Sequence, residues 1–392
     1  MSQPFFPSLL PSPFHLRTAR LCNTNAWVEE NGWTKPAYFN DPQDEYWALR
    51  SSAGIYDLAG LIPYKVSGRD AAPLLDYVMT DNMTALAVGT ARHCLWCDDQ
   101  GHILGDGVVY RLSRDEFRIF TRQKTYLWLA EAAVGFEATV EDLSRSLCGL
   151  AVQGPEARDL LLGVGLSEAA TLRPLDIAET ELQKVPVLIG RVSCSAELGF
   201  EIFVEANDAL FLWDELMHCR AVLPTAVGVD AMRTATIEAG HPRHGVDYLS
   251  PQSATRPHRA ASPFDLGLGG RVDFNKPYFV GRNALEQKRS DVPHQSLVGI
   301  SYAGPSAFTE CPIHAGGKPV GATTNVVWSP KLAQYIGFAW ILSSVQASHA
   351  PLSLQGHYVD ELKVEAVDVP IHIVPRPFFT ASTYLETPVA TA

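Results

Sequence analysis

CDDQGHILGDGVVY, residues 97–110, is the stretch of this chain that decides its fold. The Asp and Gly residues at 98–101 supply the backbone angles of a tight turn, so the stretch predicts a β-hairpin. Its second strand carries Asp106 between Gly105 and Gly107. Glycine weakens a strand unless something approaches its backbone closely, and a carboxylate on an apolar strand is costly to bury without a partner. Asp106 is therefore either an edge-strand residue with a partner or a functional acid.

Length, composition and charge describe a folded protein of several domains. The 392 residues exceed one ordinary core and predict two or three domains. Hydrophobic residues make up 46% of the chain and charged residues 19%, as in globular proteins. The formal charge of -12 argues against a nucleic-acid partner or an anionic membrane surface. Apolar runs stay below the roughly 18 residues of a membrane span, and residues 1–16 lack the order of a signal peptide, so we expect a cytoplasmic protein.

The seven cysteines do not have the pattern of a disulfide framework or a metal site. Cys94 and Cys97 have a C-x-x-C spacing, but no second pair completes a zinc site. His241, His244 and His258 lack the spacing of an H-E-x-x-H motif. We therefore expect no metal, and we expect these histidines to be structural or solvated.

Apolar periodicity predicts an α+β protein with a β-rich C-terminal part. Helical spacing occurs at 45–52, 70–79, 125–134, 156–162 and 229–239, and short strands are expected at 61–66, 94–97, 108–112, 117–121, 147–152, 185–192 and 200–205. This mixture predicts α+β layers rather than a regular βαβ repeat. From about residue 295 the chain alternates short strands and turns, which predicts a small barrel. Residues 1–40, rich in Pro, Asn and Gly, predict irregular structure.

Eight short motifs follow one another in order between residues 40 and 290. They are EYWALR (45–50), GIYDL (54–58), VSGRDAA (66–72), the hairpin with Asp106, VQGPEA (152–157), ELGFE (197–201), IEAG (237–240) and FVGRNAL (279–285). Each motif alone is weak, but their order and spacing together resemble the aminomethyltransferase family built on the glycine-cleavage T-protein. A weaker likeness continues to about residue 380.

The resemblance implies a three-domain cloverleaf around a central channel that binds tetrahydrofolate. We expect two interwoven α+β domains over residues 1–290 and a C-terminal β-barrel domain with a tail over 291–392. Glu201 matches the family's pterin-binding glutamate, since a carboxylate can accept two N–H donors of the ring. Asp106 matches the aspartate beside the reacting folate nitrogen N5, which makes it the expected catalytic residue and a folate contact. Gln153 matches an amide that lines the pocket, although stabilisation of a turn explains it equally well.

Other residues separate the chain from a true glycine-cleavage enzyme. Thr236 stands where the T-protein motif R-L-E-x-G has its arginine, and residues 192–197 read VSCSAE in place of T-G-Y-T-G-E. The hairpin and Arg122 are instead similar to tetrahydrofolate-dependent O-demethylases of vanillate- or syringate-like acids. There the matching arginine holds the aromatic carboxylate, although Arg122 could also be a solvated residue at a strand end. Met232 stands where those enzymes carry a tyrosine implicated in catalysis and cannot donate a proton, which keeps N- or S-demethylation open.

These features predict a tetrahydrofolate-dependent methyltransferase that demethylates a small organic donor and forms 5-methyltetrahydrofolate. A methoxy-aromatic acid is the favoured donor, and N- or S-demethylation or a glycine-cleavage-like aminomethyl transfer are alternatives. A non-catalytic folate-binding accessory protein is a third, disfavoured because the Lys-Gly-Cys-Tyr-x-Gly-Gln signature of such members reads KPYFVGR at 276–282. Beyond the small-molecule methyl donor we expect no nucleic-acid and no membrane partner, and the oligomeric state stays open.

Overall fold

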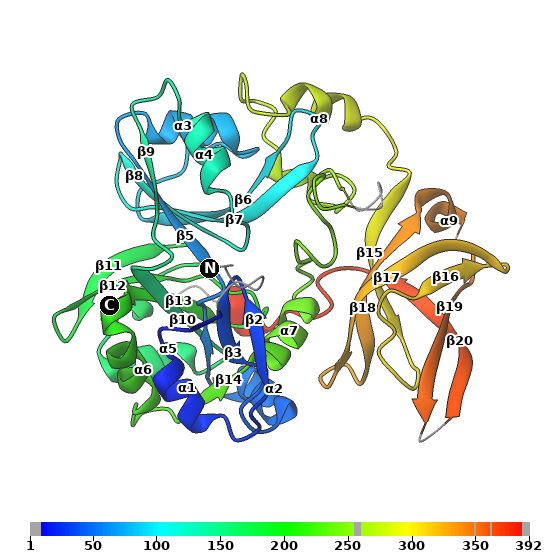
Figure 1. Cartoon of the computed structure of the whole chain (residues 1–392), viewed down its shortest axis with the longest axis horizontal. Helices are drawn as coiled ribbons and strands as arrows, with labels where there is room; N and C mark the ends of the chain where they lie inside the picture. The colour runs from blue at the N-terminus through cyan, green and yellow to red at the C-terminus, as the bar shows by residue number, and fades with distance from the viewer. Residues whose placement is uncertain (1–8, 255–259, 349, 361–362, 386–392) are drawn as a thin grey trace, which may run out of the picture.

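The computed structural model describes residues 9–254, 260–348, 350–360 and 363–385. Two α+β parts lie side by side and a closed β-barrel stands next to them (Figure 1). This arrangement confirms the predicted α+β fold with a C-terminal barrel. Across the described ranges, no helix has the length and apolar character needed to cross a membrane.

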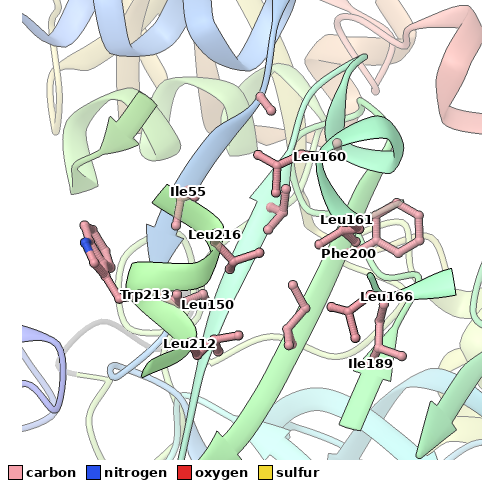
Figure 2. Packing of buried hydrophobic residues seen from close by; sticks show 14 of the residues in the cluster. Ile55, Leu150, Leu160, Leu161, Leu166, Ile189, Phe200, Leu212, Trp213 and Leu216 are labelled. Atoms are coloured by element: carbon pink, nitrogen blue, oxygen red, sulfur yellow. The ribbon is translucent and has the colours of Figure 1, made fainter. Parts of the chain in front are cut away.

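The first part is a six-stranded sheet packed against two helices. Its strands follow the order β11 (Ile177–Leu182), β12 (Val185–Gly190), β13 (Gly199–Glu205), β10 (Leu147–Gln153), β4 (Gly54–Asp57) and β14 (Thr225–Val227). The β4–β14 pair is parallel and the other neighbours are antiparallel. The helices α5 (Ala157–Val164) and α6 (Ala209–Met217) bury their apolar sides in the core of this part (Figure 2). On α6, Leu212 and Leu216 are one helical turn apart and therefore face the sheet together.

The second part is a five-stranded antiparallel sheet whose chain lies between β4 and β10 of the first. Its strands follow the order β6 (Thr90–Cys97), β7 (Ile103–Arg111), β8 (Glu116–Thr121), β5 (Ile62–Ser67) and β9 (Thr139–Asp142). The helices α3 (Ala71–Val78) and α4 (Tyr126–Ala132) pack against this sheet. The chain therefore leaves the first part, builds the second and returns.

The predicted hairpin joins β6 and β7. The Asp98 side chain accepts two backbone N–H bonds across the turn, of 2.7 and 3.0 Å. A Cβ atom on Gly105 would lie 2.5 Å from a ring carbon of the buried Trp96, and one on Gly107 would lie 2.6 Å from the Phe120 carbonyl oxygen. The two glycines are therefore required by the packing of the sheet itself.

The C-terminal part is a closed six-stranded barrel. Its strands follow the order β15 (Gln295–Tyr302), β18 (Gln334–Leu342), β17 (Lys318–Ser329), β16 (Pro312–Ala315), β19 (Leu352–Asp360) and β20 (Lys363–Val374). The short helix α9 (Ser343–Ser348) follows β18. Alternate residues of the strands fill the interior, as the pleat of a closed barrel requires.

The N-terminal segment is structured, contrary to the prediction for residues 1–40. Its described part forms α1 (His15–Leu21) and a small sheet of β1 (Leu10–Pro11), β2 (Trp27–Glu30) and β3 (Trp33–Pro36). These elements are too short to show a periodic pattern, and packing against the first part sustains them. Phe14, for example, is completely buried in its core.

Two helices connect the first part to the barrel and to the C-terminal segment. Arg50 on α2 (Pro42–Ser51) forms an ion pair with Glu238 at the end of α7 (Val229–Glu238), and both side chains are buried. The Tyr46 hydroxyl donates to Glu238 Oε1 at 2.8 Å, and the Ser329 hydroxyl of the barrel strand β17 donates to the same oxygen. The backbone N–H of Phe378, in the C-terminal segment, donates to the Glu238 carbonyl at 2.9 Å.

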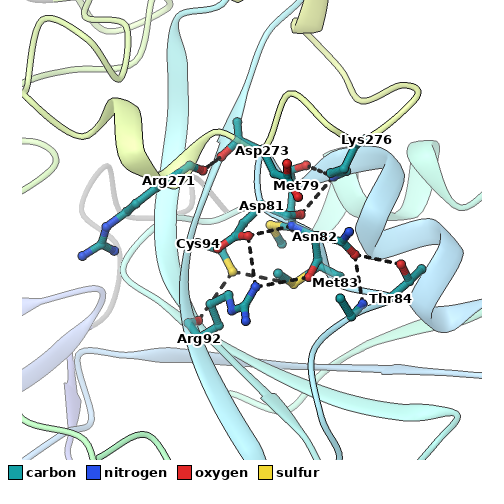
Figure 3. A network of polar contacts seen from close by, with 12 residues as sticks. Met79, Asp81, Asn82, Met83, Thr84, Arg92, Cys94, Arg271, Asp273 and Lys276 are labelled. Carbon is teal, nitrogen blue, oxygen red and sulfur yellow. Dashed lines mark hydrogen bonds and ion pairs between the residues drawn. The ribbon is translucent and has the colours of Figure 1, made fainter.

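A buried lysine holds residues 260–280 against the second part. Lys276 Nζ donates to the backbone carbonyl oxygens of Met79 and Asp81 at 2.7 and 2.9 Å (Figure 3). It also donates to the carbonyl oxygen of Asp76 at 2.5 Å. An ammonium group has three N–H donors, so these carbonyls use all of them. The helix α8 (Arg282–Lys288) follows directly.

Candidate active site

A cavity of about 210 Å³ lies where the three parts meet. Its wall receives side chains from β7 and β8 of the second part, β13 of the first, α7, residues 241–248 and the barrel strand β17. Much of this wall is apolar. The carboxylates and guanidinium groups on it are Asp106, Glu201, Arg122, Arg233, Arg243 and Arg271. Four guanidinium groups and two carboxyl groups therefore line this cavity, although the whole chain is acidic.

Asp106 lies on β7, half-buried, with its carboxylate on the cavity wall. The Tyr248 hydroxyl donates to Asp106 Oδ1 at 3.0 Å. The backbone of Asp106 is held too, since its N–H donates to Gln123 Oε1 at 3.1 Å and its carbonyl accepts from the Thr121 hydroxyl at 2.7 Å. Burial and the nearby carboxylate raise the pKa of Tyr248 well above its usual value, so this hydroxyl remains a donor at neutral pH.

Glu201 lies on β13 and is 7% exposed at the same cavity. The Tyr110 hydroxyl donates to Glu201 Oε2 at 3.0 Å. Burial raises the pKa of Glu201 to about 7, against the opposing effects of this hydrogen bond and of Arg122. Near neutral pH the group therefore exists both as a carboxylate acceptor and as a carboxylic acid.

Arg122 follows the last residue of β8 and also lines the cavity. Its guanidinium forms an ion pair with Glu30, the last residue of β2, and its carbonyl accepts from Asn31 Nδ2 at 2.9 Å. Burial favours the neutral guanidine, but Glu30 and Tyr56 outweigh that effect and raise the pKa of Arg122. Arg122 is thus an anchored cation on the cavity wall rather than a solvated strand-end residue.

Met232 is buried on α7 and lines the cavity. Its sulfur lies 3.8 Å from Cys194 Sγ. The Thr236 hydroxyl, one turn later, donates to the Met232 carbonyl at 2.8 Å. This stretch of α7 therefore presents the thioether of Met232 and the hydroxyl of Thr236 to the cavity. Position 236 carries no positive charge.

Gln153 is brought close to the cavity but is not part of its lining. Its Oε1 atom accepts from the Ser193 and Ser195 hydroxyls, each at 2.7 Å, and its Nε2 atom lies 3.4 Å from the Val192 carbonyl. Val192 and Ser193 do line the cavity. These contacts agree with the reading of Gln153 as a residue that stabilises a turn.

Three histidines and Tyr248 face the cavity without having been singled out as site residues from the sequence. His93 and His241 stack with ring centroids 6.4 Å apart, and burial, with Arg271 adding to it, lowers their pKa values to about 3 and about 4. The Nε2 atom of His244 is buried without a hydrogen-bond partner among the described residues. No motif marks these positions, because only the folded loop brings residues 241–248 to β7.

No cluster of three or more potential metal ligands occurs within the described part of the chain.

Comparison with known proteins agrees with this architecture. A model of the GCVT N-terminal domain family matches residues 19–276. The chain is similar to an aminomethyltransferase of Streptomyces avermitilis, at 33% identity over 89% of this chain and 92% of the relative, and to one of Bacillus pumilus, at 28% identity over 90% and 94%.

The fold is similar to the crystal structure of glycine cleavage system aminomethyltransferase T from Bartonella henselae. The TM-score is 0.83 at 21% identity, with coverage of 95% of this chain and 98% of that one. The match of the family model to more than half of the chain, together with a relative at 33% identity, shows that this protein belongs to the aminomethyltransferase (GCVT) family.

Proposed function

We propose that this protein is a tetrahydrofolate-dependent methyltransferase that removes a methyl group from a small organic donor and forms 5-methyltetrahydrofolate. Membership of the aminomethyltransferase family supports a one-carbon transferase of this kind. The single observation that carries the proposal is that Asp106 and Glu201 line one cavity, each held by a tyrosine hydroxyl.

The donor and acceptor groups of the cavity suit a reduced pterin. A pterin carries several N–H donors along one edge, and Glu201 offers the matching acceptor from a buried position on the cavity. When bound, the folate supplies N5, the nitrogen that receives the one-carbon unit. Glu201 would hold the ring, and its ionised form would hold it best.

Asp106 would stabilise the positive charge that develops on the folate nitrogen and accept the proton that this nitrogen releases. Positive charge develops at the accepting nitrogen when the bond from the methyl carbon to the donor atom breaks and the new bond forms. A fixed carboxylate stabilises that charge and can accept the proton that the nitrogen gives up. The Tyr248 hydroxyl keeps the carboxylate in one orientation.

The cations of the cavity support an acidic methyl donor, with a methoxy-aromatic acid favoured. Arg122 is fixed at the wall and can bind a carboxylate through its fork of N–H groups. Cleavage of a methyl ether also needs a proton at the departing oxygen, which Met232 cannot supply. The Tyr248 hydroxyl lines the same cavity and is the candidate donor of that proton. Methyl groups on a cationic nitrogen or sulfur need no such donor, so N- or S-demethylation is the nearest variant.

A glycine-cleavage-like aminomethyltransferase is the second candidate. The favouring observation is that curated relatives of 28–33% identity, covering about nine-tenths of the chain, carry the name aminomethyltransferase. Thr236 argues against this candidate, because it stands where the T-protein motif has an arginine and its hydroxyl donates to the Met232 carbonyl of its own helix.

The product distinguishes the two candidates. The protein is incubated with tetrahydrofolate and a panel of methoxybenzoates, methylated amines and methylsulfonium compounds, and the folate products are identified by mass spectrometry. We expect 5-methyltetrahydrofolate from a methoxybenzoate. Formation of 5,10-methylenetetrahydrofolate that requires a lipoyl-bound aminomethyl carrier would support the second candidate and contradict the first.

A further inference from the structure

The barrel strand β17 has a β-bulge at the point where it reaches the cavity. Thr323 and Asn325 pair with Ala339 and Phe338 of the neighbouring strand β18, so the pairing skips Thr324. Side chains of a regular strand alternate between its two faces, so residues 323 and 325 would otherwise point the same way. A bulge adds one residue to a strand and redirects the side chains around it.

The bulge separates the contacts of Thr323 from those of Asn325. The Thr323 hydroxyl donates to the Phe308 carbonyl at 2.7 Å, within the barrel. Asn325 instead lines the cavity, where its Oδ1 atom accepts from Arg233 Nε of α7 at 3.0 Å. The bulge therefore directs Asn325 away from the barrel and toward the cavity.

Thr324, at the bulge, and Trp340 hold Asp247 against the barrel. The Thr324 hydroxyl donates to Asp247 Oδ1, and Trp340 Nε1 of β18 donates to the Asp247 carbonyl at 2.8 Å. The other carboxylate oxygen, Oδ2, accepts from the backbone N–H of Arg243 at 2.7 Å. Asp247 is completely buried, and these bonds offset the cost of removing its carboxylate from water.

Asp247 also fixes the backbone that carries Tyr248. Its N–H donates to the Arg243 carbonyl at 2.8 Å, which together with the Arg243 bond to Oδ2 closes the turn. The Gly245 N–H donates to the Tyr248 carbonyl at 2.8 Å. The Tyr248 hydroxyl, at the far end of its side chain, donates to Asp106 Oδ1 at 3.0 Å. A small displacement of the turn would therefore spoil this bond, because hydrogen bonds weaken steeply when their geometry is poor.

We propose that Asp247 is a positioning residue of the active site, through which Thr324 at the bulge holds the Tyr248 hydroxyl on the Asp106 carboxylate. Thr324 and Asp247 are outside the cavity lining, so neither contacts a ligand there. The barrel thereby contributes to turnover without touching the reacting atoms. Only the effect on turnover rests on the proposed function; the effect on the contact between Tyr248 and Asp106 does not.

Two adjacent threonines of β17 give matched variants. Thr324→Val removes the hydroxyl that binds Asp247 and nearly keeps the shape of the side chain. Thr323→Val removes a similarly buried hydroxyl that bonds within the barrel, so it is the control for a general loss of stability. Thr324→Ser keeps the hydroxyl and should behave as the wild type. Asp247→Asn disturbs the same contact from the other side, because an amide has one acceptor oxygen where a carboxylate has two.

The hydrogen bond of Tyr248 is measured by NMR, without turnover. The tyrosines are labelled with ¹³C at Cζ, the Tyr248 resonance is identified by its loss in Tyr248→Phe, and Asp106→Asn gives its position without the carboxylate. We expect the resonance to move toward that position in Thr324→Val and Asp247→Asn, and to stay in place in Thr323→Val. An unmoved resonance in Thr324→Val, or an equal movement in Thr323→Val, would overturn the proposal. If Thr324→Val does not fold, Asp247→Asn decides the matter in the same way.

Turnover then tests whether the contact matters for catalysis. With a methyl donor that is active on the wild type, Thr324→Val should lower kcat at least about tenfold and change KM less than about twofold, because the binding groups stay in place while a catalytic hydrogen bond is displaced. Thr323→Val should keep both values. A moved Tyr248 resonance with an unchanged kcat would overturn the role in catalysis and leave the methyltransferase proposal in place. A moved resonance with no methylated folate from any donor would contradict the methyltransferase proposal alone.

Discussion

At the residue scale, the cavity contains two carboxyl groups whose surroundings differ. Glu201 is almost completely buried and has a pKa near 7. Asp106 is half-buried and accepts from Tyr248. A group that titrates near neutral pH can bind a ligand as an acceptor or as a donor, whereas a fixed carboxylate is suited to stabilising charge. The two residues therefore lead to different predictions.

Replacing the Asp106 carboxylate by an amide should separate binding from chemistry. In Asp106→Asn we expect kcat of the demethylation to fall by about 100-fold or more, because the amide can neither accept the proton nor stabilise the charge. Tetrahydrofolate affinity, measured by fluorescence titration, should change less than about threefold, since the side chain keeps its shape. Asp99→Asn, an exposed change in the adjacent hairpin turn, is the control. Full activity in Asp106→Asn would remove this residue from the mechanism.

The raised pKa of Glu201 should be visible in the pH dependence of stability. The folded state holds this proton up to about pH 7, whereas the unfolded chain releases it near pH 4.5. The stabilising contribution of the proton is complete below pH 4.5 and is lost as the pH rises to 7. Compared with wild type, Glu201→Gln should therefore gain about 3 kcal/mol in the free energy of unfolding between pH 4.5 and pH 8.

Urea unfolding of both proteins at the two pH values measures this difference, with Glu205→Gln, exposed at the end of the same strand, as the control. The same Glu201→Gln variant should bind tetrahydrofolate more weakly at pH 8, because the pterin donors lose a charged acceptor. A stability difference that does not change with pH would show that Glu201 titrates at an ordinary pKa.

At the scale of elements, the β6–β7 hairpin positions Asp106 through very close strand packing. Gly107→Ala would place a methyl group 2.6 Å from the Phe120 carbonyl oxygen, on a backbone that is fixed by pairing with β8. We expect a loss of about 1–3 kcal/mol in the free energy of unfolding, since an added methyl in a packed sheet forces strands apart. Urea unfolding monitored by tryptophan fluorescence gives the value. Gly270→Ala, where a Cβ would meet nothing within 4 Å, should change it by less than about 0.5 kcal/mol.

At the scale of the whole molecule, Glu238 joins the helices α2 and α7 to the barrel and to the C-terminal segment. Removing Glu238 takes from the buried Arg50 its closer carboxylate, leaves it the Glu197 carboxylate at 3.4 Å, and removes the acceptor of the Tyr46 and Ser329 hydroxyls. Glu238→Ala should therefore lower the free energy of unfolding by about 3–5 kcal/mol. Asp214→Ala breaks the half-exposed pair with Arg17 and should cost less than about 1 kcal/mol.

Calorimetry of both variants makes this comparison. An equal, small loss in the two would show that the junction around Glu238 does not hold the parts together.

The predictable parts of the structure are those in which a local pattern is long enough to decide the outcome. The turn at 98–101 closes as its Asp and Gly residues predict, and the helix expected at 229–239 is found at Val229–Glu238. Residues 10–36 could not be predicted in this way, because their strands of two to four residues are too short to show a pattern and are stabilised by packing against neighbouring elements. Glu30 lies in that segment, so the anchor of Arg122 could not be predicted.

The sequence by itself determined the family and the α+β architecture with its barrel, because ordered motifs and periodic apolar residues act locally. It also predicted site roles for Asp106, Glu201, Arg122 and Met232, all of which line the cavity. Only the tertiary structure decided which groups accompany them. Tyr248, Arg243 and Glu30 come from loops and short strands between 92 and 213 residues away along the chain from the groups they bind. Their contacts arise from the packing of three separate parts around one cavity, and no spacing within the sequence encodes such a meeting.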